Sequence, residues 1–586
     1  MLQRLAFAVA ALQAALPLGA ATFPLKYTAL LNADIDAIAV DAAGSVYITG
    51  STYDVLPTTP GAFQAGYHAT SCYYGHQNRT CPVAYAAKLT PDGTSLVYLT
   101  YLGMANSFGS GISVDAQGNA WITGNVSSSD LPVTPNAFQV FPQGFQDPFA
   151  LKLNATGSRV LYATYLGGTG SSGPAYPFEV SSALSQAIDR AGHVYIAGIV
   201  NSAEFPVTRG SYQTDNGGAQ MTSFAISFDS AGSVVYSTYF HGGSGSSTAI
   251  TSIAVDPTGN IYVTGTHQGG SLPTTTGAFQ TSAGAGAYAA FAAKLDPTGS
   301  NLIYSTYLAA NSPVSGTAIA VDNKGSAYVT GGVTLQKAPS TFPVTQGAFQ
   351  TLPPTLPIQI VGLSSFLTKL NPAGTGLVYS TLLGPNGDTW TGSITVDSAG
   401  SAIVSGYTFA LDFPTTPGAL RQCRSDTGDN GGFLLKLAAD GSHPVYSTYL
   451  GANTPSSVVV DTAGEIYLGG YLGSQPPPVI PGSVGWNSGG ESFALAVIPQ
   501  ALPAGSVNCV LNAASRIEMS IAPGEIIDIL GNGIGPEESV PLRLFPVRFQ
   551  RLSAASRFCS TTNPRPCSPL GRIRFVRWFR LNSLQA

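Results

Sequence analysis

The sequence predicts an all-β fold, a seven-bladed β-propeller of four-stranded antiparallel blades, on three observations. A phrase of the form Val-Asp-x-x-Gly-x-x-Tyr, with mild substitutions, returns seven times at intervals of 64–75 residues. The copies hold four strand-like segments each, except that the seventh lacks the last, and they show no helical periodicity, which is the pattern of propeller blades. The 68 Gly and 41 Pro among 586 residues are typical of short strands joined by tight turns. The seven repeat aspartates are Asp41, Asp115, Asp189, Asp256, Asp322, Asp397 and Asp461.

Residues 1–21 have the three parts of a secretory signal peptide. A positively charged start precedes an apolar run over residues 5–16, and small residues follow it, with cleavage expected near Ala20 or Ala21. A buried N-terminal strand or helix is the less favoured interpretation. No later segment reaches the roughly 18 uninterrupted apolar residues of a membrane helix, so we expect no transmembrane span. The mature protein is therefore predicted to be secreted, periplasmic or at the cell surface.

The fourth copy shows how each unit is interpreted as strands. β-branched and aromatic residues cluster in four short segments, and Asp-Pro-Thr-Gly turns separate the first from the second and the third from the fourth. In such a turn Asp accepts hydrogen bonds from backbone amides and Gly supplies a positive φ. A longer polar connection, ending in residues 272–280, joins the second strand to the third. The predicted strands are 252–255, 260–265, 290–295 and 302–308.

The two ends of the repeated region predict how the ring closes. The seventh copy runs to residues 493–497 and then lacks a fourth strand. Residues 25–31, which precede the first copy, match the fourth-strand pattern of residues 96–102. We therefore predict that residues 25–31 pair into the last blade and close the ring, which removes a free sheet edge. The predicted propeller domain spans residues 22–499.

A second phrase accompanies the first: Leu-Pro-Thr-Thr-Pro-Gly-Ala-Phe-Gln at residues 56–64, with variants at 131–139 and 413–420. Together the two phrases resemble the bacterial beta-propeller repeat called SBBP, over roughly residues 25–498. The resemblance implies an exported or cell-surface propeller, commonly without an assigned activity. The resemblance implies no catalytic residue in this chain.

Two further regions follow the repeats. Residues 500–540 begin as a linker and continue like the start of the small Ig-like β module that often follows such propellers. Residues 541–586 contain nine Arg and no Lys, Asp or Glu. Such a tail would suit nucleic acid or anionic lipid. It is equally what an out-of-frame reading of GC-rich DNA produces, and we favour that frameshift interpretation.

The seven repeat aspartates are interpreted as structural turn caps, because each stands before x-x-Gly in its copy. A ring of calcium-binding carboxylates is the alternative. Residues 214–218 and 426–432 also place oxygen donors beside glycines, as calcium loops do, but neither reproduces the full alternating ligand pattern. Ordinary polar turns are favoured at both places. We assign no catalytic, cofactor-binding or metal-binding residue and expect no cofactor, with calcium as the one ion considered.

The loop over residues 65–82 is the most distinctive insertion. Cys72 and Cys81 lie in it, close enough in sequence to close a small ring, and we expect a disulfide between them. Its Tyr and His side chains would suit contact with a sugar or a protein. The favoured interpretation is that the disulfide only stabilises a long loop. The candidate ligand-binding residues are Tyr67, His68, Tyr73, Tyr74 and His76. No spacing selects partners for Cys423, Cys509, Cys559 and Cys567.

The net charge and the sequence variation among the seven copies limit the functions that the protein can have. Only 9% of residues are charged and the net charge is −5, so electrostatics give no reason to expect a nucleic-acid partner. The copies keep strand and turn residues, while insertions lie between strands, where binding surfaces arise. We therefore expect a non-catalytic, monomeric scaffold that binds a carbohydrate or protein through inter-strand loops. The alternatives are an extracellular hydrolase or lyase with its site at the central channel, which needs converging titratable side chains, and a structural envelope or matrix protein.

Overall fold

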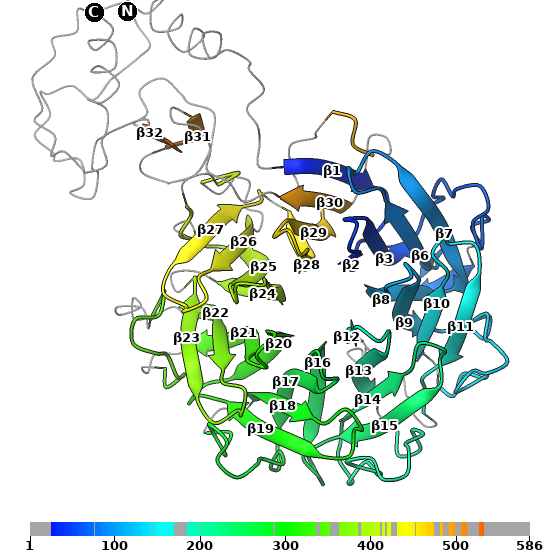
Figure 1. Cartoon of the computed structure of the whole chain (residues 1–586), viewed down its shortest axis with the longest axis horizontal. Coiled ribbons are helices and arrows are strands. Elements are labelled where there is room, and N and C mark those ends of the chain that lie inside the picture. Colours follow the sequence, from blue (N-terminus) through cyan, green and yellow to red (C-terminus); the bar gives the residue numbers. More distant parts are fainter. Residues whose placement is uncertain are drawn as a thin grey trace, which may run out of the picture.

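The computed structural model contains seven four-stranded antiparallel sheets arranged as the blades of a ring (Figure 1). This arrangement confirms the predicted all-β, seven-bladed propeller. Among the described residues every regular element is a β-strand, and none forms a helix suited to crossing a membrane. The described residues are 25–68, 70–74, 77–144, 146–168, 185–200, 202–284, 288–335, 340–351, 362–384, 388–410, 413–416, 419–422, 431–451, 453–473, 481–484, 492–497, 506–512 and 527–532.

The blades are numbered along the chain, and their strands run from the central channel outward. Blade one has β2 (Ala37–Val40), β3 (Val46–Thr52), β6 (Val83–Leu89) and β7 (Leu96–Ala105); blade two has β8 (Ser107–Val114), β9 (Ala120–Val126), β10 (Asp147–Leu153) and β11 (Val160–Tyr165); blade three has β12 (Ser185–Ile188), β13 (Val194–Val200), β14 (Thr222–Phe228) and β15 (Val234–Phe240); blade four has β16 (Ser247–Val255), β17 (Ile261–Gln268), β18 (Ala289–Leu295) and β19 (Leu302–Leu308). Blade five has β20 (Val314–Val321), β21 (Ala327–Leu335), β22 (Gly362–Leu370) and β23 (Leu377–Leu383); blade six has β24 (Thr389–Val396), β25 (Ala402–Thr408), β26 (Gly431–Leu437) and β27 (Pro444–Tyr449); blade seven has β28 (Thr454–Val460), β29 (Ile466–Tyr471), β30 (Ser492–Val497) and β1 (Leu25–Leu31).

The N-terminal strand closes the ring, as predicted. β1 pairs antiparallel with β30, with Thr28 opposite Leu495, and so becomes the outermost strand of blade seven. Figure 1 shows β1 and β30 side by side at the rim, next to blade one. The strand missing from the seventh copy is thus supplied from the opposite end of the repeated region.

Outside the ring, β31 (Ser506–Asn512) and β32 (Ile527–Asn532) form an antiparallel pair within the region predicted as a linker and the start of an Ig-like module. The predicted signal peptide and the Arg-rich tail, residues 1–21 and 541–586, lie outside the described residues. So do Cys423, Cys559 and Cys567, whereas Cys509 lies in β31.

The innermost strands are longer than the sequence pattern predicts. In blade four, β16 begins at Ser247 rather than at residue 252, because its pairing with β17 continues past a bulge between Ile250 and Ser252. Equivalent bulges occur in the innermost strands of blades two, five, six and seven. A bulge inserts one unpaired residue and breaks the alternation of side chains. The alternation of side chains therefore stops at the bulge, although the strand continues beyond it.

The hydrophobic core lies between blades rather than inside any one of them. Among the described residues the buried apolar side chains form seven clusters, and each cluster draws on two neighbouring blades. The cluster at the closure combines Tyr27 and Tyr467 of blade seven with Ile48, Tyr85 and Leu99 of blade one. Each blade is therefore buried on both faces only when its two neighbours are in place.

A tyrosine–glycine contact recurs at the junctions between blades. The first Tyr of an outermost strand packs beneath the glycine that ends the last turn of the next blade, and that glycine has φ between 65° and 92°. A methyl group added to these glycines would lie 2.2–2.5 Å from the tyrosine ring. Only glycine therefore meets both the backbone and the packing requirement. The pairs are Tyr27–Gly93, Tyr98–Gly157, Tyr162–Gly232, Tyr236–Gly299, Tyr304–Gly374 and Tyr379–Gly441.

The Pro-Thr-Thr-Pro-Gly-Ala-Phe-Gln segment covers the outer edge of each blade. In blade one, Thr59 N–H donates to the Leu99 carbonyl at 3.2 Å, and Thr59 Oγ1 accepts the Leu99 N–H at 3.1 Å. The same two-way bond recurs in blades two to six. In blade seven Leu30 N–H donates to the Val484 carbonyl at 3.1 Å. Part of each exposed strand edge, which would otherwise be open to pairing with another chain, is thereby occupied.

The closure junction yields a direct test. Gly93→Ala would place a methyl group 2.2 Å from the Tyr27 ring at φ +66°, so we expect a loss of about 2–4 kcal/mol from backbone strain and overpacking. Gly61→Ala is the matched control, because Gly61 has φ +80° but nothing within 4 Å of the added carbon. It should lose only about 1–2 kcal/mol. Equilibrium urea unfolding measures both, and equal losses would contradict the packing of β1 against blade one.

Candidate functional site

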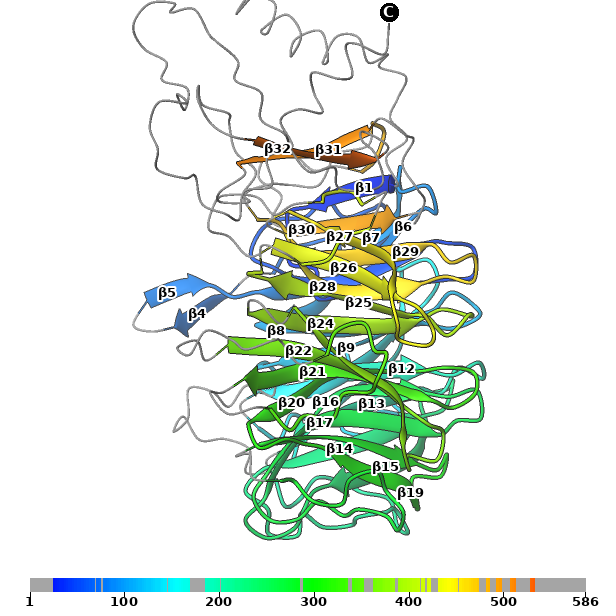
Figure 2. The same ribbon diagram turned by 90° about the vertical axis from the view of Figure 1, so that its left-hand side faces the viewer.

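The two faces of the ring carry different connections, because an antiparallel blade reverses direction at each strand. The short turns, such as residues 41–45 and 90–95, lie on one face, here called the turn face. The connections from second to third strands, such as residues 53–82, and those between blades lie on the other, the loop face. Figure 2 shows the hairpin of β4 (Ser71–Tyr74) and β5 (Gln77–Thr80) standing away from the ring on the loop face.

The repeat aspartates lie at the inner turns of the turn face. In all seven copies Oδ1 accepts the backbone N–H groups of the second and fourth residues after the Asp, at 2.8–3.1 Å. This geometry holds the turn closed and leaves Oδ2 for other partners.

In five copies Oδ2 forms an ion pair with a lysine from the third strand of the same blade. The distances range from 2.7 Å for Lys436–Asp397 to 3.5 Å for Lys294–Asp256. The other pairs are Lys88–Asp41, Lys152–Asp115 and Lys369–Asp322. Copies three and seven have Ser227 and Ala496 at the lysine position. The aspartates of those two copies therefore have no lysine on the third strand to pair with, and Asp189 Oδ2 instead lies 3.1 Å from His193 Nδ1.

The repeat tyrosine connects this turn to the next blade. Tyr328 OH lies 3.1 Å from Asp322 Oδ2 and 2.9 Å from the carbonyl of Gly400 in the next blade, so its single proton is shared between them. Tyr47 and Tyr262 make the equivalent contacts with Gly118 and Gly325 at 3.3 Å. The repeated phrase is thus one hydrogen-bonded unit that spans two blades.

Hydrogen bonding lowers the pKa of several repeat aspartates, among them Asp256 and Asp322. Burial would raise the pKa of Asp256, but hydrogen bonds from Thr258, Asn260 and Tyr262 outweigh it and lower the pKa to about 2. The pKa of Asp322 is also lowered, because backbone and Tyr328 hydrogen bonds and Lys369 outweigh burial. Neither carboxyl group carries a proton near neutral pH, so neither can act as a general acid there.

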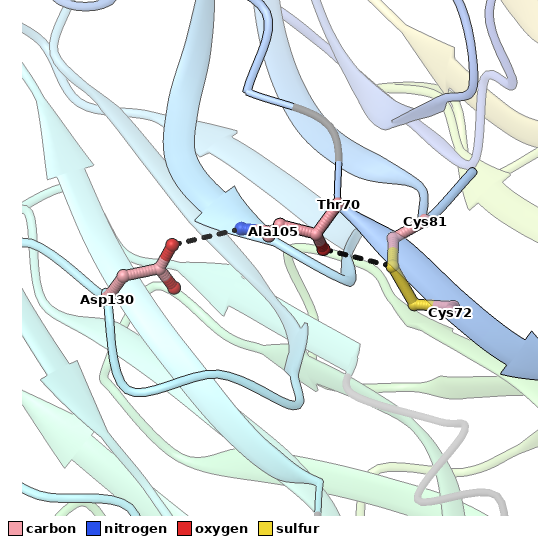
Figure 3. The surroundings of a disulfide bond; sticks show 5 residues. All are labelled: Thr70, Cys72, Cys81, Ala105 and Asp130. Atoms are coloured by element: carbon pink, nitrogen blue, oxygen red, sulfur yellow. Dashed lines mark hydrogen bonds between the residues drawn. A yellow bond between two sulfur atoms is a disulfide. The ribbon is translucent and has the colours of Figure 1, made fainter.

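A disulfide between Cys72 and Cys81 closes a small ring within the loop over residues 65–82 (Figure 3). Thr70 Oγ1 donates to Cys81 Sγ at 3.1 Å. Nearby, the Ala105 N–H donates to the Asp130 carboxylate at 3.2 Å. Cys81 is buried, so the bridge ties the exposed hairpin to a fixed point of blade one.

The five candidate ligand-binding residues of this loop lie in different surroundings. Tyr67 is partly buried against Tyr101, with ring centroids 5.5 Å apart, and so helps to hold the loop on the blade. His68 is exposed. Tyr73 and Tyr74 lie in β4, but their side chains, like His76 as a whole, lie outside the described residues. The described part therefore places one of the five against the core and one at the surface.

Of the two turns considered as calcium sites, residues 214–218 and 426–432, only the first lies wholly within the described residues. At residues 214–218, Asp215 Oδ1 accepts the Gly217 N–H at 2.8 Å, and its carbonyl lies 2.9 Å from His241 Nε2. Most of residues 426–432 lies outside the described part. Within the described ranges no group of three or more His, Cys, Asp or Glu is placed to hold a metal ion.

An aromatic cluster that the sequence interpretation missed lies on the loop face of blade six. Trp390, near the start of β24, stacks on Tyr407 with ring centroids 4.9 Å apart and planes 19° apart. Phe409 meets both rings edge-on, at 5.8 and 6.4 Å, and is 39% exposed. The signal available in the sequence was Trp390 itself, since blade five has the small Ser315 at this position.

An unusual carboxyl group lies at the junction of blades seven and one, also on the loop face. Burial raises the pKa of Asp36 to about 6, even though Tyr471 OH donates to its Oδ1 at 2.6 Å. Asp34 adds to the rise, and its own pKa is raised by burial. Tyr53 and Tyr471 are 48% and 37% exposed, so this part of the face is open to solvent.

A small pocket of about 240 Å³ lies at the turn-face mouth of the channel. Blades five, six and seven line it with the ends of their innermost strands and the turns that follow, and Arg190 reaches it from blade three. Its three aspartates, Asp322, Asp397 and Asp461, are repeat aspartates whose Oδ1 atoms are engaged within their turns.

Comparison with known proteins identifies the repeat. The family of beta-propeller repeats called SBBP matches residues 235–272 and 303–331. A search of curated proteins found no match. Similar solved structures include hydrazine synthase from Kuenenia stuttgartiensis (9% identity, TM-score 0.37, covering 75% of this chain and 92% of that one). Others are a Dos1 propeller (8%, 0.35, 81% and 95%) and a protein of unknown function from Dyadobacter fermentans (11%, 0.32, 67% and 96%).

The hydrogen bonds that the Asp256 carboxylate accepts predict a pH dependence of stability. The folded-state pKa of Asp256, about 2, lies below the roughly 3.9 of an unfolded chain. The ionised carboxylate therefore contributes stability above about pH 4, and this contribution is lost as the pH falls towards 2. Asp256→Asn should lower the urea midpoint at pH 7, and the gap to the parent protein should narrow below pH 4.

Asp215→Asn is the control for this experiment, because the Asp215 carboxylate accepts one backbone N–H, that of Gly217. It should cost less at pH 7. A constant gap between Asp256→Asn and the parent protein from pH 7 to pH 2.5 would contradict the assignment.

The disulfide should stabilise the hairpin and not the ring. Replacing Cys72 and Cys81 together by Ser should remove up to about 3 kcal/mol of local stability. Limited proteolysis should then cut within residues 65–82 faster, while the urea midpoint of the ring stays unchanged. A large fall in that midpoint would instead make the bridge part of the ring's cooperative unit.

Proposed function

We propose that this chain, in which residues 235–272 and 303–331 match the SBBP beta-propeller repeat, is a non-catalytic binding scaffold, secreted or at the cell surface. Its loop face would hold the partner, and a carbohydrate is the partner we favour. The motif residues are engaged in turns, ion pairs and blade junctions. The side chains free to contact a partner are therefore those that differ from blade to blade.

The observation that carries this proposal is the cluster of Trp390, Tyr407 and Phe409. Two stacked rings with a third set edge-on form a rigid surface that loses little entropy on binding. An aromatic face is electron-rich and apolar, so it suits the C–H face of a sugar ring, while nearby polar groups bind its hydroxyls. Phe409 remains 39% exposed although it packs against both neighbours.

Asp36 favours a second candidate, an extracellular hydrolase acting at the loop-face end of the channel. A carboxyl group with a pKa near 6 is suited to donate a proton to a leaving group. Asp34 is the second carboxyl on the same segment. If this candidate is right, hydrolysis of glycoside substrates should fall as the pH rises through 6 and should disappear in Asp36→Asn.

The binding proposal is tested on glycan and protein arrays with the purified protein. We expect glycan binding that the double variant Trp390→Ala/Phe409→Ala weakens at least tenfold. Val445→Ala is the matched control, because Val445 is 50% exposed on the outer strand β27 and lies away from the cluster. It should bind like the parent protein.

Two results would count against this assignment. If the protein binds nothing on either array, the proposal that it is a binding scaffold is wrong. If the protein binds proteins but not glycans, and this binding still depends on Trp390 and Phe409, the binding-scaffold proposal stands. A carbohydrate is then excluded as the partner.

A further inference from the structure

The pocket on the turn face is lined by the residue that directly follows the repeat Asp, a position of the inner turn that varies in chemistry. The residue directly after the repeat Asp is Arg190, Asn323, Ser398 or Thr462 in copies three, five, six and seven, and all four line the pocket. In the remaining copies that position holds Ala42, Ala116 and Pro257, whose side chains cannot form hydrogen bonds, and none of them lines the pocket. Polar side chains therefore occur where the pocket is and are missing where it is not.

The pocket combines an apolar wall with a polar rim. Val321, Val396 and Val460, the residues before the repeat Asp, supply the apolar part. The rim offers a guanidinium group, an amide and two hydroxyls. A volume of about 240 Å³ lies below the roughly 300–1,000 Å³ of sites for drug-sized molecules, so the pocket suits one small molecule.

The carboxylates that line the pocket are largely engaged in hydrogen bonds and ion pairs within the protein. Lys369 lies 3.4 Å from Asp322 and Lys436 lies 2.7 Å from Asp397, which offsets two of the three negative charges. Asp461 accepts two backbone N–H groups and the Tyr467 hydroxyl, but Lys26 of the same blade pairs with Glu465 and not with Asp461. One uncompensated negative charge thus remains close to the pocket.

Arg190 is the cationic group of the pocket that is open to a ligand. Its side chain is exposed, and within the described part of the chain its guanidinium forms no ion pair. A guanidinium group binds a carboxylate through two parallel hydrogen bonds. A phosphate carries up to two negative charges and would be repelled more strongly by Asp461 than a carboxylate, which carries one.

We propose that this pocket binds a small polyhydroxylated carboxylate of the size of a single hexuronic acid. Its carboxylate pairs with Arg190, its hydroxyls bind Asn323, Ser398 and Thr462, and its C–H groups contact the valines. The site lies on the face opposite the aromatic cluster, so it stands independently of the carbohydrate site proposed above.

The test measures binding of D-glucuronate to the full-length protein by calorimetry, with D-glucose and acetate for comparison. We expect glucuronate to bind at least tenfold more tightly than either. Arg190→Ala should weaken glucuronate binding at least tenfold. Arg209→Ala, at an exposed position outside the pocket, should leave it unchanged. Ser398→Ala/Thr462→Val should weaken glucuronate several-fold and leave acetate unchanged.

The proposal is overturned if glucuronate does not bind the parent protein, or if it binds Arg190→Ala and the parent equally. It is also overturned if acetate binds as tightly as glucuronate, because the rim hydroxyls and amide would then contribute nothing. Urea unfolding of each variant shows that the fold is retained; Arg190 is exposed, so its replacement should leave the urea midpoint close to that of the parent.

Discussion

Both faces of every blade must be buried, and only a neighbouring blade can bury them. This requirement places the core in seven inter-blade clusters. It also explains the contact of an outer-strand tyrosine with the turn glycine of the next blade, since the ring lies where any side chain on that glycine would stand. The contact holds adjacent blades at one spacing. A repeated spacing and angle produce a closed ring, and closure buries the last pair of faces.

The boundary of the repeat differs from the boundary of the blade, and this offset explains the closure by β1. Each segment matched by the repeat family begins in the outer strand of one blade and ends in or just after the second strand of the next. A row of such units leaves the first outer strand without a blade and the last blade without an outer strand. β1 resolves both at once, and Tyr27 then meets Gly93 as Tyr98 meets Gly157.

The fold was predictable because its determinants recur at a fixed period, and Leu25–Leu31 could be assigned by matching a pattern. The lysine partners of the repeat aspartates also recur, but pairing Lys88 with Asp41 requires the register of three strands. The candidate sites depend on residues that do not recur. Arg190 of blade three and Thr462 of blade seven line one pocket although they are far apart in the sequence. No local pattern carries that information. The motifs therefore build the ring, and the exceptions to them mark where ligands are expected.

The central claim is that residues 25–31 form the outer strand of blade seven and join it to blade one. Amide hydrogen exchange followed by mass spectrometry measures this directly in the unmodified protein. If β1 pairs with β30, its amides should be protected as strongly as those of the ordinary outer strand β19 and should open together with the ring. Exchange of residues 25–31 at the rate of an unstructured peptide, with β19 still protected, would contradict the account.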